Sequence, residues 1–220
     1  MLSEVERHLE LLNSLEVGQV NLGVGPIIEQ VLLPQVLTTF IESTNGGEVA
    51  VVTEDDETLL EMFASSELDI VVGPFAAKDW QRRDITSIPM IEDEIVAITR
   101  HDHPIMQEPK VSLELLMSYP LIAPKAQGTA KNSKFSQITE ILKVKSDNYD
   151  LLKKVTLTTD SICAAPRSAF REELDAGELV EVNSPLSITW SSALLVRPET
   201  LASPLASKLV SLFEQAAAMH

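Results

Sequence analysis

The sequence predicts an α/β fold built around a parallel sheet. Strand-like segments at 20–24, 48–52 and 68–72 alternate with helix-like segments at 27–43 and 57–65. This order predicts parallel strands with right-handed crossovers. The segment 68–72 is an almost continuous apolar run, which is typical of a strand buried on both faces.

Turn and cap residues lie where these elements should begin and end. Gly25-Pro26 precedes the first long helix, and proline is tolerated in a first helical turn. Asn45-Gly46-Gly47 is a turn signal. Thr53-Glu54-Asp55-Asp56 can cap the next helix, with carboxylates at its positive end. The chain should turn again at Gly73-Pro74.

The rest of the chain continues the α/β pattern. Strands are predicted at 85–90, 94–99, 120–124, 144–146, 161–165, 179–182 and 193–196. Helices are predicted at 111–116, 132–142, 149–157, 168–176 and 203–218. Pro89 indicates that the strand at 85–90 is short or lies at a sheet edge.

Two helices have apolar surface that needs a partner. Residues 1–16 form an amphipathic stripe, which fits either a helix packed on its own domain or the end of a coiled connector. The helix at 27–43 is apolar on several faces, which indicates a central position or a subunit interface.

Composition excludes several functions. The chain of 220 residues has 33 acidic and 17 basic residues and a net charge of −16, so it should be repelled by nucleic acid. No apolar run is long enough to span a membrane, and the N-terminus does not read as a signal peptide. A cytoplasmic protein is therefore expected. The single cysteine, Cys163, cannot form an internal disulfide and is expected in the core.

Signals for catalysis and metal binding are weak. The sequence has no nucleophile elbow, Walker loop or dinucleotide fingerprint, and none of its histidines has the setting of a catalytic base. Glu54–Glu57 fits helix-terminal carboxylates better than a hard-cation site. His101-x-His103 lacks a clear third zinc ligand. No enzymatic activity, cofactor or metal is predicted.

Several short motifs occur in an order that is more specific than any one of them. They are Gly23-Val24-Gly25-Pro26 with Leu32-Leu33-Pro34, the segment 66–73, His103-Pro104, the segment 111–116, Tyr119-Pro120-Leu121-Ile122 and Pro166-Arg167-Ser168. From about residue 18 to residue 215, the chain resembles the effector-binding domains of LysR-type transcriptional regulators.

This resemblance implies a type II periplasmic-binding-protein-like fold, with two α/β lobes joined by two crossover strands and a ligand cleft between them. Residues 1–17 would be the remnant of a linker helix, 18–92 plus 194–220 would form lobe I, and 93–193 lobe II. The implied partners are a small-molecule effector and other copies of the chain, in a homodimer or tetramer. DNA would be contacted only through an N-terminal helix-turn-helix domain absent from this chain, and no membrane would be bound.

In open α/β sheets, ligands bind beyond the carboxyl ends of the strands, next to helix N-termini. The residues expected there are Gly25, Pro26, Ile27, Asp56, Gly73, Pro74, Phe75, Pro124, Lys125, Gln127, Thr129, Asn148 and Tyr149. Each could instead be a solvated loop or cap residue. Asp56 favours an amine or hydroxyl group on the ligand, whereas Lys125 favours an anion, so the chemical class stays open.

Two other functions fit the same fold. A stand-alone solute-binding protein of a transporter is the nearer alternative, although the lack of a signal peptide counts against it. An enzyme is the third, because fold alone does not determine function.

Overall fold

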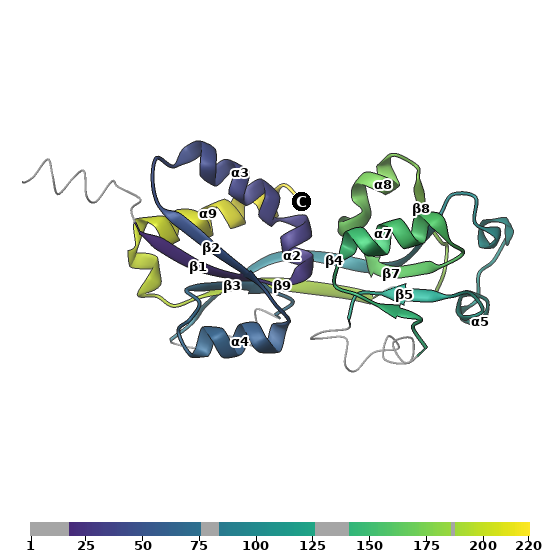
Figure 1. Ribbon diagram of the computed structural model, residues 1–220, viewed down its shortest axis with the longest axis horizontal. Coiled ribbons are helices and arrows are strands. Elements are labelled where there is room, and N and C mark those ends of the chain that lie inside the picture. Colours follow the sequence, from purple (N-terminus) through teal and green to yellow (C-terminus); the bar gives the residue numbers. More distant parts are fainter. Residues whose placement is uncertain (1–17, 76–83, 126–140, 186–187) are drawn as a thin grey trace, which may run out of the picture. The chain divides into compact units, whose positions relative to one another are not determined.

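The computed structural model describes residues 18–75, 84–125, 141–185 and 188–220 (Figure 1). The chain divides into two compact units. The first ends at Ile91 and resumes at Ser192, and the second is Glu92–Ser191. The strands β4 (Thr86–Arg100) and β9 (Ile188–Val196) both run across these boundaries, so two strands join the units.

The first unit contains the parallel sheet that the sequence predicts. Strand β1 (Gln19–Val24) lies between β2 (Glu48–Thr53) and β3 (Ile70–Gly73) and is parallel to both. On its other side, β3 pairs with β9 in antiparallel register, from Ile70 opposite Val196 to Gly73 opposite Ala193. The parallel order of the first three strands is therefore confirmed.

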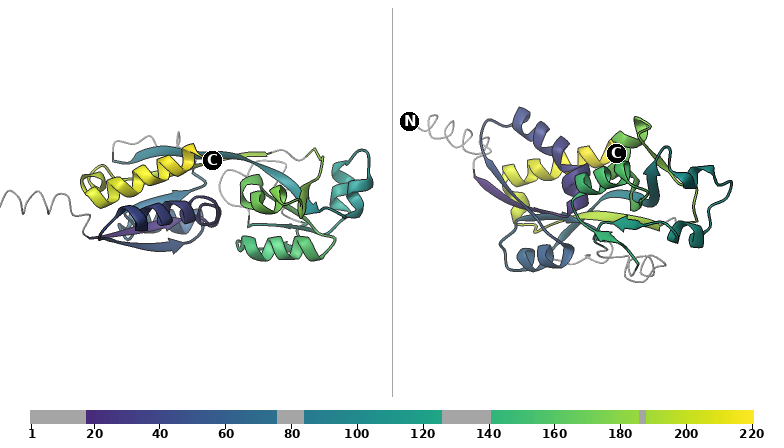
Figure 2. Two further views of the ribbon diagram at one scale, coloured as in Figure 1. Left: turned by 90° about the horizontal axis from the view of Figure 1, so that it is seen from above. Right: turned by 45° about the vertical axis from the view of Figure 1, so that its right-hand side comes forward.

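Helices cover both faces of this sheet (Figure 1). They are α2 (Pro26–Val31), α3 (Leu33–Ser43), α4 (Asp56–Ala64) and α9 (Pro204–Ala218), with the short 3-10 helix η5 (Thr200–Ala202) before α9. α3 and α9 pack side by side on one face, as both views in Figure 2 show, and α4 covers the other face. The fully buried side chains of Leu22, Ile70 and Phe213 lie in this core.

The predicted single helix at 27–43 is wrong, because the chain breaks at Leu32 between α2 and α3. Pro34 has no backbone N–H, and its ring would collide with the carbonyl four residues earlier in a continuous helix. It is accommodated only because α3 starts afresh, with Pro34 in its first turn.

The second unit has a mixed sheet. β7 (Ile162–Pro166) lies between β4, to which it is antiparallel, and β5 (Leu121–Ala123), to which it is parallel. β6 (Val144–Lys145) continues the parallel part from β5, and β8 (Leu179–Glu181) pairs with β4. Its helices are η2 (Pro104–Gln107), α5 (Leu113–Met117), α7 (Tyr149–Thr158), η4 (Arg167–Phe170) and α8 (Arg171–Asp175).

Several helices begin at caps that the sequence predicts. The Ser112 hydroxyl accepts the N–H of Leu115 at 3.2 Å, and the Asn148 side chain accepts the N–H of Leu151 at 2.9 Å. Each contact satisfies one of the free N–H groups of a first helical turn. Gly177, at φ +71°, follows α8 as the expected stop.

Two further predictions need correction. The segments 85–90 and 94–99 form one continuous strand, β4, because no glycine or proline separates them; the exposed Pro89 lies within it. The predicted helix at 168–176 begins as the 3-10 turn η4. The predicted helix at 132–142 lies mostly outside the described residues, as does the whole of 1–17.

No helix within the described ranges is both long and apolar enough to cross a bilayer. Cys163 is fully buried in β7, where burial raises the pKa of its thiol to about 12.

Candidate functional site

The carboxyl ends of β1, β2 and β3 meet at one edge of the first sheet, because these strands are parallel. Backbone hydrogen bonds hold the loops that follow them together. The N–H of Gly25 donates to the Val72 carbonyl at 2.8 Å, and the N–H of Glu54 donates to the Val24 carbonyl at 3.3 Å. The loops that carry the predicted residues of the first unit are therefore neighbours.

Two glycines lie where the first and third of these loops approach. A Cβ atom on Gly25 would lie 3.4 Å from Cδ of Pro74 and 3.7 Å from Cα of Gly73. A Cβ atom on Gly73 would lie 2.8 Å from Cζ of Phe75, so the phenyl ring covers the glycine. The structure thus brings Gly25, Gly73, Pro74 and Phe75 together, with Pro26 beside them at the start of α2.

The apolar members of this group face inward. Ile27 is 7% exposed and Phe75 4% exposed. Phe75 packs in a core cluster with Leu59, Phe63 and Leu195. In this structure the side chains of Ile27 and Phe75 therefore point into the core and support the loops from the inside.

Carboxylates surround the start of α4. Asp55 is the N-cap, and its Oδ1 accepts the N–H of Thr58 at 2.9 Å. The half-buried Asp56, which is the predicted ligand contact, follows in the first turn together with Glu57. The positive end of this helix is stabilised by the protein's own negative charges.

In the second unit, the loop after β5 is tied to the start of α7. Asp147 makes both contacts with Lys125: Oδ1 accepts its backbone N–H at 2.9 Å, and Oδ2 lies 3.3 Å from its Nζ. The N–H of Ser146 donates to the Ala123 carbonyl at 3.1 Å. The structure therefore brings Pro124 and Lys125 near Asn148, whereas Gln127 and Thr129 lie outside the described residues.

Tyr149 is a core residue in this structure. It is 6% exposed, and its ring meets Phe170 edge to face with centroids 6.4 Å apart. Burial raises the pKa of its hydroxyl group well above the usual range, so the ring is neutral at physiological pH.

Sequence reasoning did not include Asp147 or Asp93 among the site residues. Asp93 Oδ2 accepts the N–H of Ser168 at 2.9 Å, which connects β4 to the turn after β7. Next to it, Arg167 pairs with Glu94 at 3.1 Å and with Glu181 at 2.6 Å, and Glu181 contributes most to raising the arginine's pKa. The one available signal was the position of Asp147 directly before a predicted N-cap.

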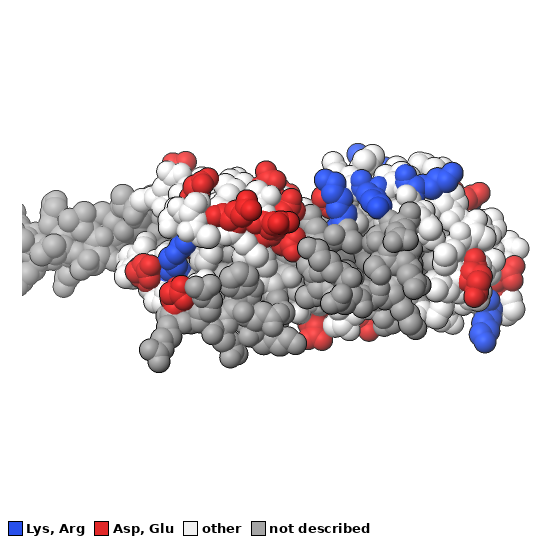
Figure 3. Space-filling view, turned by 90° about the horizontal axis from the view of Figure 1, so that it is seen from below, with Lys and Arg blue, Asp and Glu red and all other residues white. Residues whose placement is uncertain are grey.

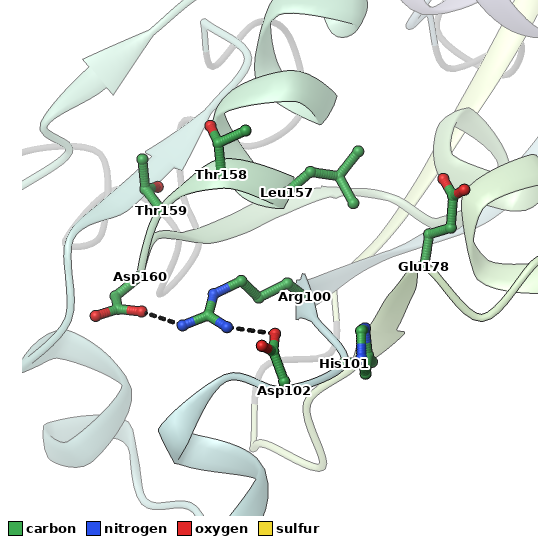
Figure 4. Close-up of a pocket in the computed structure, with 8 residues that line it drawn as sticks. All are labelled: Arg100, His101, Asp102, Leu157, Thr158, Thr159, Asp160 and Glu178. Carbon is green, nitrogen blue, oxygen red and sulfur yellow. Dashed lines mark hydrogen bonds and ion pairs between the residues drawn. The ribbon is translucent and has the colours of Figure 1, made fainter.

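A separate hollow of about 560 Å³ lies at the edge of the second unit's sheet that is opposite the loop carrying Lys125 (Figure 4). Its lining residues are Arg100, His101, Asp102, Leu157, Thr158, Thr159, Asp160 and Glu178. The Arg100 guanidinium bridges Asp102 and Asp160, with an N–O distance of 2.6 Å to the latter. These two hydrogen bonds raise the pKa of Arg100, and the arginine lowers that of Asp102.

The two histidines of the His101-x-His103 pattern separate in the structure. His101 is exposed at the hollow, whereas His103 is 1% exposed and accepts the N–H of Ile105 through Nδ1 at 3.0 Å. The His103 ring also packs against Tyr119, with centroids 4.6 Å apart. Across the described parts of the chain, no three His, Cys, Asp or Glu side chains gather in a way that could hold a metal ion.

The chain has two α/β units that are joined by two strands. The loops expected to bind a ligand follow the carboxyl ends of the parallel strands. This arrangement defines a type II periplasmic-binding-protein-like fold. The LysR substrate-binding-domain model matches residues 13–218, and the chain belongs to that family. The fold and family expected from the sequence motifs are both confirmed.

Individual relatives are distant. The chain is 25% identical over 108 residues to the HTH-type transcriptional regulator PcaQ of Agrobacterium fabrum, a match that covers 49% of this chain and 34% of that protein. The chain therefore spans about a third of that curated relative's length. Because the matched relatives are regulators, the transporter alternative has no support from them.

Solved structures share the fold. The cofactor-binding domain of the Cbl transcriptional regulator aligns with a TM-score of 0.73 at 15% identity, over 90% of this chain and 89% of that one. The CcmR regulatory domain from Synechocystis, in complex with 2-PG, aligns with a TM-score of 0.70 at 14% identity, over 91% of this chain and 97% of that one.

Proposed function

We propose that the chain is the effector-sensing regulatory domain of a LysR-type transcriptional regulator and binds a small metabolite without turning it over. The observation that carries this proposal is the family match over residues 13–218, together with the meeting of the loops at Gly25 and Gly73. Ligand binding would shift the population of domain or subunit arrangements and so reposition DNA-binding domains.

The predicted contact residues remain part of this proposal. In the first unit the contacts come from the loops at Gly25–Ile27, Asp56 and Gly73–Phe75. In the second they come from Pro124, Lys125, Asn148 and Tyr149, with Gln127 and Thr129. Support comes from the CcmR domain, whose structure contains 2-PG.

Self-association is also proposed. Ile41 on α3 is 74% exposed and Val51 on the edge strand β2 is 37% exposed, and both lie in the first unit. A homodimer would cover such exposed apolar side chains. Ile41→Asp should convert a sedimenting dimer into a monomer, while a strict monomer in the wild type would contradict this part of the proposal.

A thermal-shift screen against small metabolites tests the binding function. A ligand at about one hundred times its dissociation constant stabilises the native state by roughly 2.7 kcal/mol. Asp56→Ala should weaken the response to a hit, whereas Glu42→Ala should not. Glu42 is a suitable control because it is an exposed residue near the far end of α3 in the same unit. Catalytic consumption of the hit would contradict the proposal.

A further inference from the structure

The turn between α3 and β2 (Figure 1) carries a motif that the proposed ligand site does not use, Asn45-Gly46-Gly47. All three residues are exposed, and Gly47 has a left-handed backbone conformation with φ +85°. Because the turn precedes β2, it lies at the amino ends of the parallel strands. The motif is therefore open to water at the edge of the sheet opposite the predicted ligand contacts of the first unit.

Hydrogen bonds hold the chain on either side of this turn. Before it, Lys208 Nζ donates to the Ser43 carbonyl at 2.6 Å. After it, the N–H of Glu48 donates to the Gly18 carbonyl at 2.8 Å. Between these points, the described part of the chain offers no backbone carbonyl to the N–H groups of residues 45–47. The two ends of the turn are thus fixed, whereas the described backbone does not engage the peptide nitrogens within it.

This setting favours a reaction between the Asn45 side chain and the next peptide group. Asparagine is among the thermolabile residues of proteins. Glycine has no Cβ, so nothing on Gly46 crowds its nitrogen, and its backbone reaches conformations that other residues rarely adopt. The Asn45 side chain is exposed, so it can turn until its Cγ meets that nitrogen.

We propose that Asn45 is a site of spontaneous deamidation, with water as the co-reactant. The nitrogen of Gly46 loses its proton and bonds to Cγ of Asn45, while the bond from Cγ to the side-chain nitrogen breaks and ammonia leaves with a proton. Water then opens the cyclic imide at either carbonyl. One opening gives aspartate, and the other gives isoaspartate, in which the main chain runs through the former side chain. This modification does not depend on the proposed effector binding.

The other asparagines within the described ranges have settings that hinder the same reaction. Asn21 lies inside strand β1, between two paired neighbours. The Asn148 Oδ1 accepts the N–H of Leu151 at 2.9 Å, which holds its side chain over the start of α7. Asn183 is exposed, but the residue that follows it is Ser184, whose side chain crowds the attacking nitrogen. These positions serve as internal comparisons.

Deamidation would change both the charge and the length of the turn. Either product adds a carboxylate just beyond the last turn of α3, the negative end of that helix. Isoaspartate also adds a methylene to the main chain between Ser43 and Glu48, the two fixed points. Because of the added charge, the product should elute later than the fresh protein from an anion-exchange resin, which separates the two for analysis.

The test follows the purified chain during incubation at mildly alkaline pH, with circular dichroism as a check that the fold persists. Peptide mass spectrometry measures how much of each asparagine has become acid, and electron-transfer fragmentation distinguishes aspartate from isoaspartate. Conversion at Asn45 should exceed that at Asn148 and Asn183 and should yield both products. It should also become faster as the pH rises, because the attacking nitrogen must lose its proton.

Gly46→Ala is the matched control, since the φ of Gly46 lies outside the left-handed region and alanine fits its backbone. The variant keeps Asn45, but the added methyl group crowds the attacking nitrogen. It should deamidate about tenfold more slowly, which corresponds to a barrier higher by about 1.4 kcal/mol. An unconverted Asn45, faster conversion at Asn183, aspartate without isoaspartate, or an unchanged rate in Gly46→Ala would each overturn the proposal.

Discussion

The two units of the chain use charge differently. In the first unit, the described basic residues are Arg197 and Lys208, and both bind helix carbonyls. In the second unit, carboxylates pair with basic side chains at several places, including Lys125, Lys153 and Arg167. Figure 3 shows the same contrast on one face of each unit, with acidic side chains gathered on the first and most Lys and Arg side chains on the second.

This difference indicates what stabilises each unit. The first relies on apolar packing of α3, α4 and α9 around the sheet, and Arg197 and Lys208 satisfy carbonyls at the ends of α4 and α3. The second adds ion pairs that join separate elements, as Lys153 of α7 does with Glu173 of α8 at 3.0 Å. Substitutions that disturb apolar packing and substitutions that remove a charge should therefore affect the stability of the two units differently.

The largest effect is expected from removing one fully buried ring in each unit. Phe213→Ala in α9 should lower the free energy of unfolding by roughly 3–5 kcal/mol, through lost burial and a cavity. Phe170→Ala should cost at least as much, because this ring also contacts Tyr149 and lies 5.8 Å from Lys153 Nζ. Urea denaturation followed by circular dichroism measures both values. A loss below about 1 kcal/mol in either variant would contradict the packing account.

The next largest loss of stability is expected from breaking the buried ion pair between Lys153 and Glu173. Lys153→Met should destabilise the second unit by about 3 kcal/mol, because the Glu173 carboxylate is then buried without its partner. The double variant Lys153→Met, Glu173→Leu should regain most of that loss. If the single and double variants are equally unstable in chemical denaturation, the cost lies in packing and not in the unpaired charge.

In the first unit, Arg197→Met should cost about 1–2 kcal/mol. Its guanidinium lies 4.2 Å from the centre of the Phe63 ring and donates to the Phe63 carbonyl at the end of α4 and to the Leu68 carbonyl before β3. Hydrogen exchange should show faster opening of the last turn of α4, with α7 in the second unit unaffected. Equally faster hydrogen exchange in α4 and α7 would mean that the effect of removing Arg197 is not confined to the first unit.

The smallest effect is expected at Asp102. Arg100 lowers the pKa of this carboxyl group in the folded chain, so the pair stabilises the fold above the unfolded pKa. That stabilisation is lost as the pH falls through the folded pKa. Asp102→Asn should therefore be slightly less stable than the wild type at pH 7, and the two should converge in strong acid. A difference that persists in acid, or at 1 M salt, would exclude this electrostatic origin.

Local signals explain what the sequence predicts well. The strand–helix alternation of the first unit and the caps at Ser112 and Asn148 each depend on residues within a few positions of one another. Pro34 is also a local signal for the break at Leu32. Apolar residues continue on both sides of this break, however, so the pattern predicted a single helix.

Contacts between distant segments could not be predicted in this way. Asp147 reaches Lys125 across 22 positions, and Arg100 reaches Asp160 across 60. Nothing in the local sequence distinguishes these carboxylates from solvated ones. The inward positions of Ile27, Phe75 and Tyr149 likewise depend on tertiary packing, which the sequence pattern alone does not resolve.

Titration calorimetry of the purified chain with a hit from the metabolite screen tests the central claim most directly, with the titrated solution analysed afterwards for intact ligand. The account predicts saturable binding of one molecule per chain, weakened by Asp56→Ala and not by Glu42→Ala, with all of the ligand recovered unchanged. Conversion of the ligand, or binding that ignores both substitutions, would contradict a sensor whose site lies at these loops.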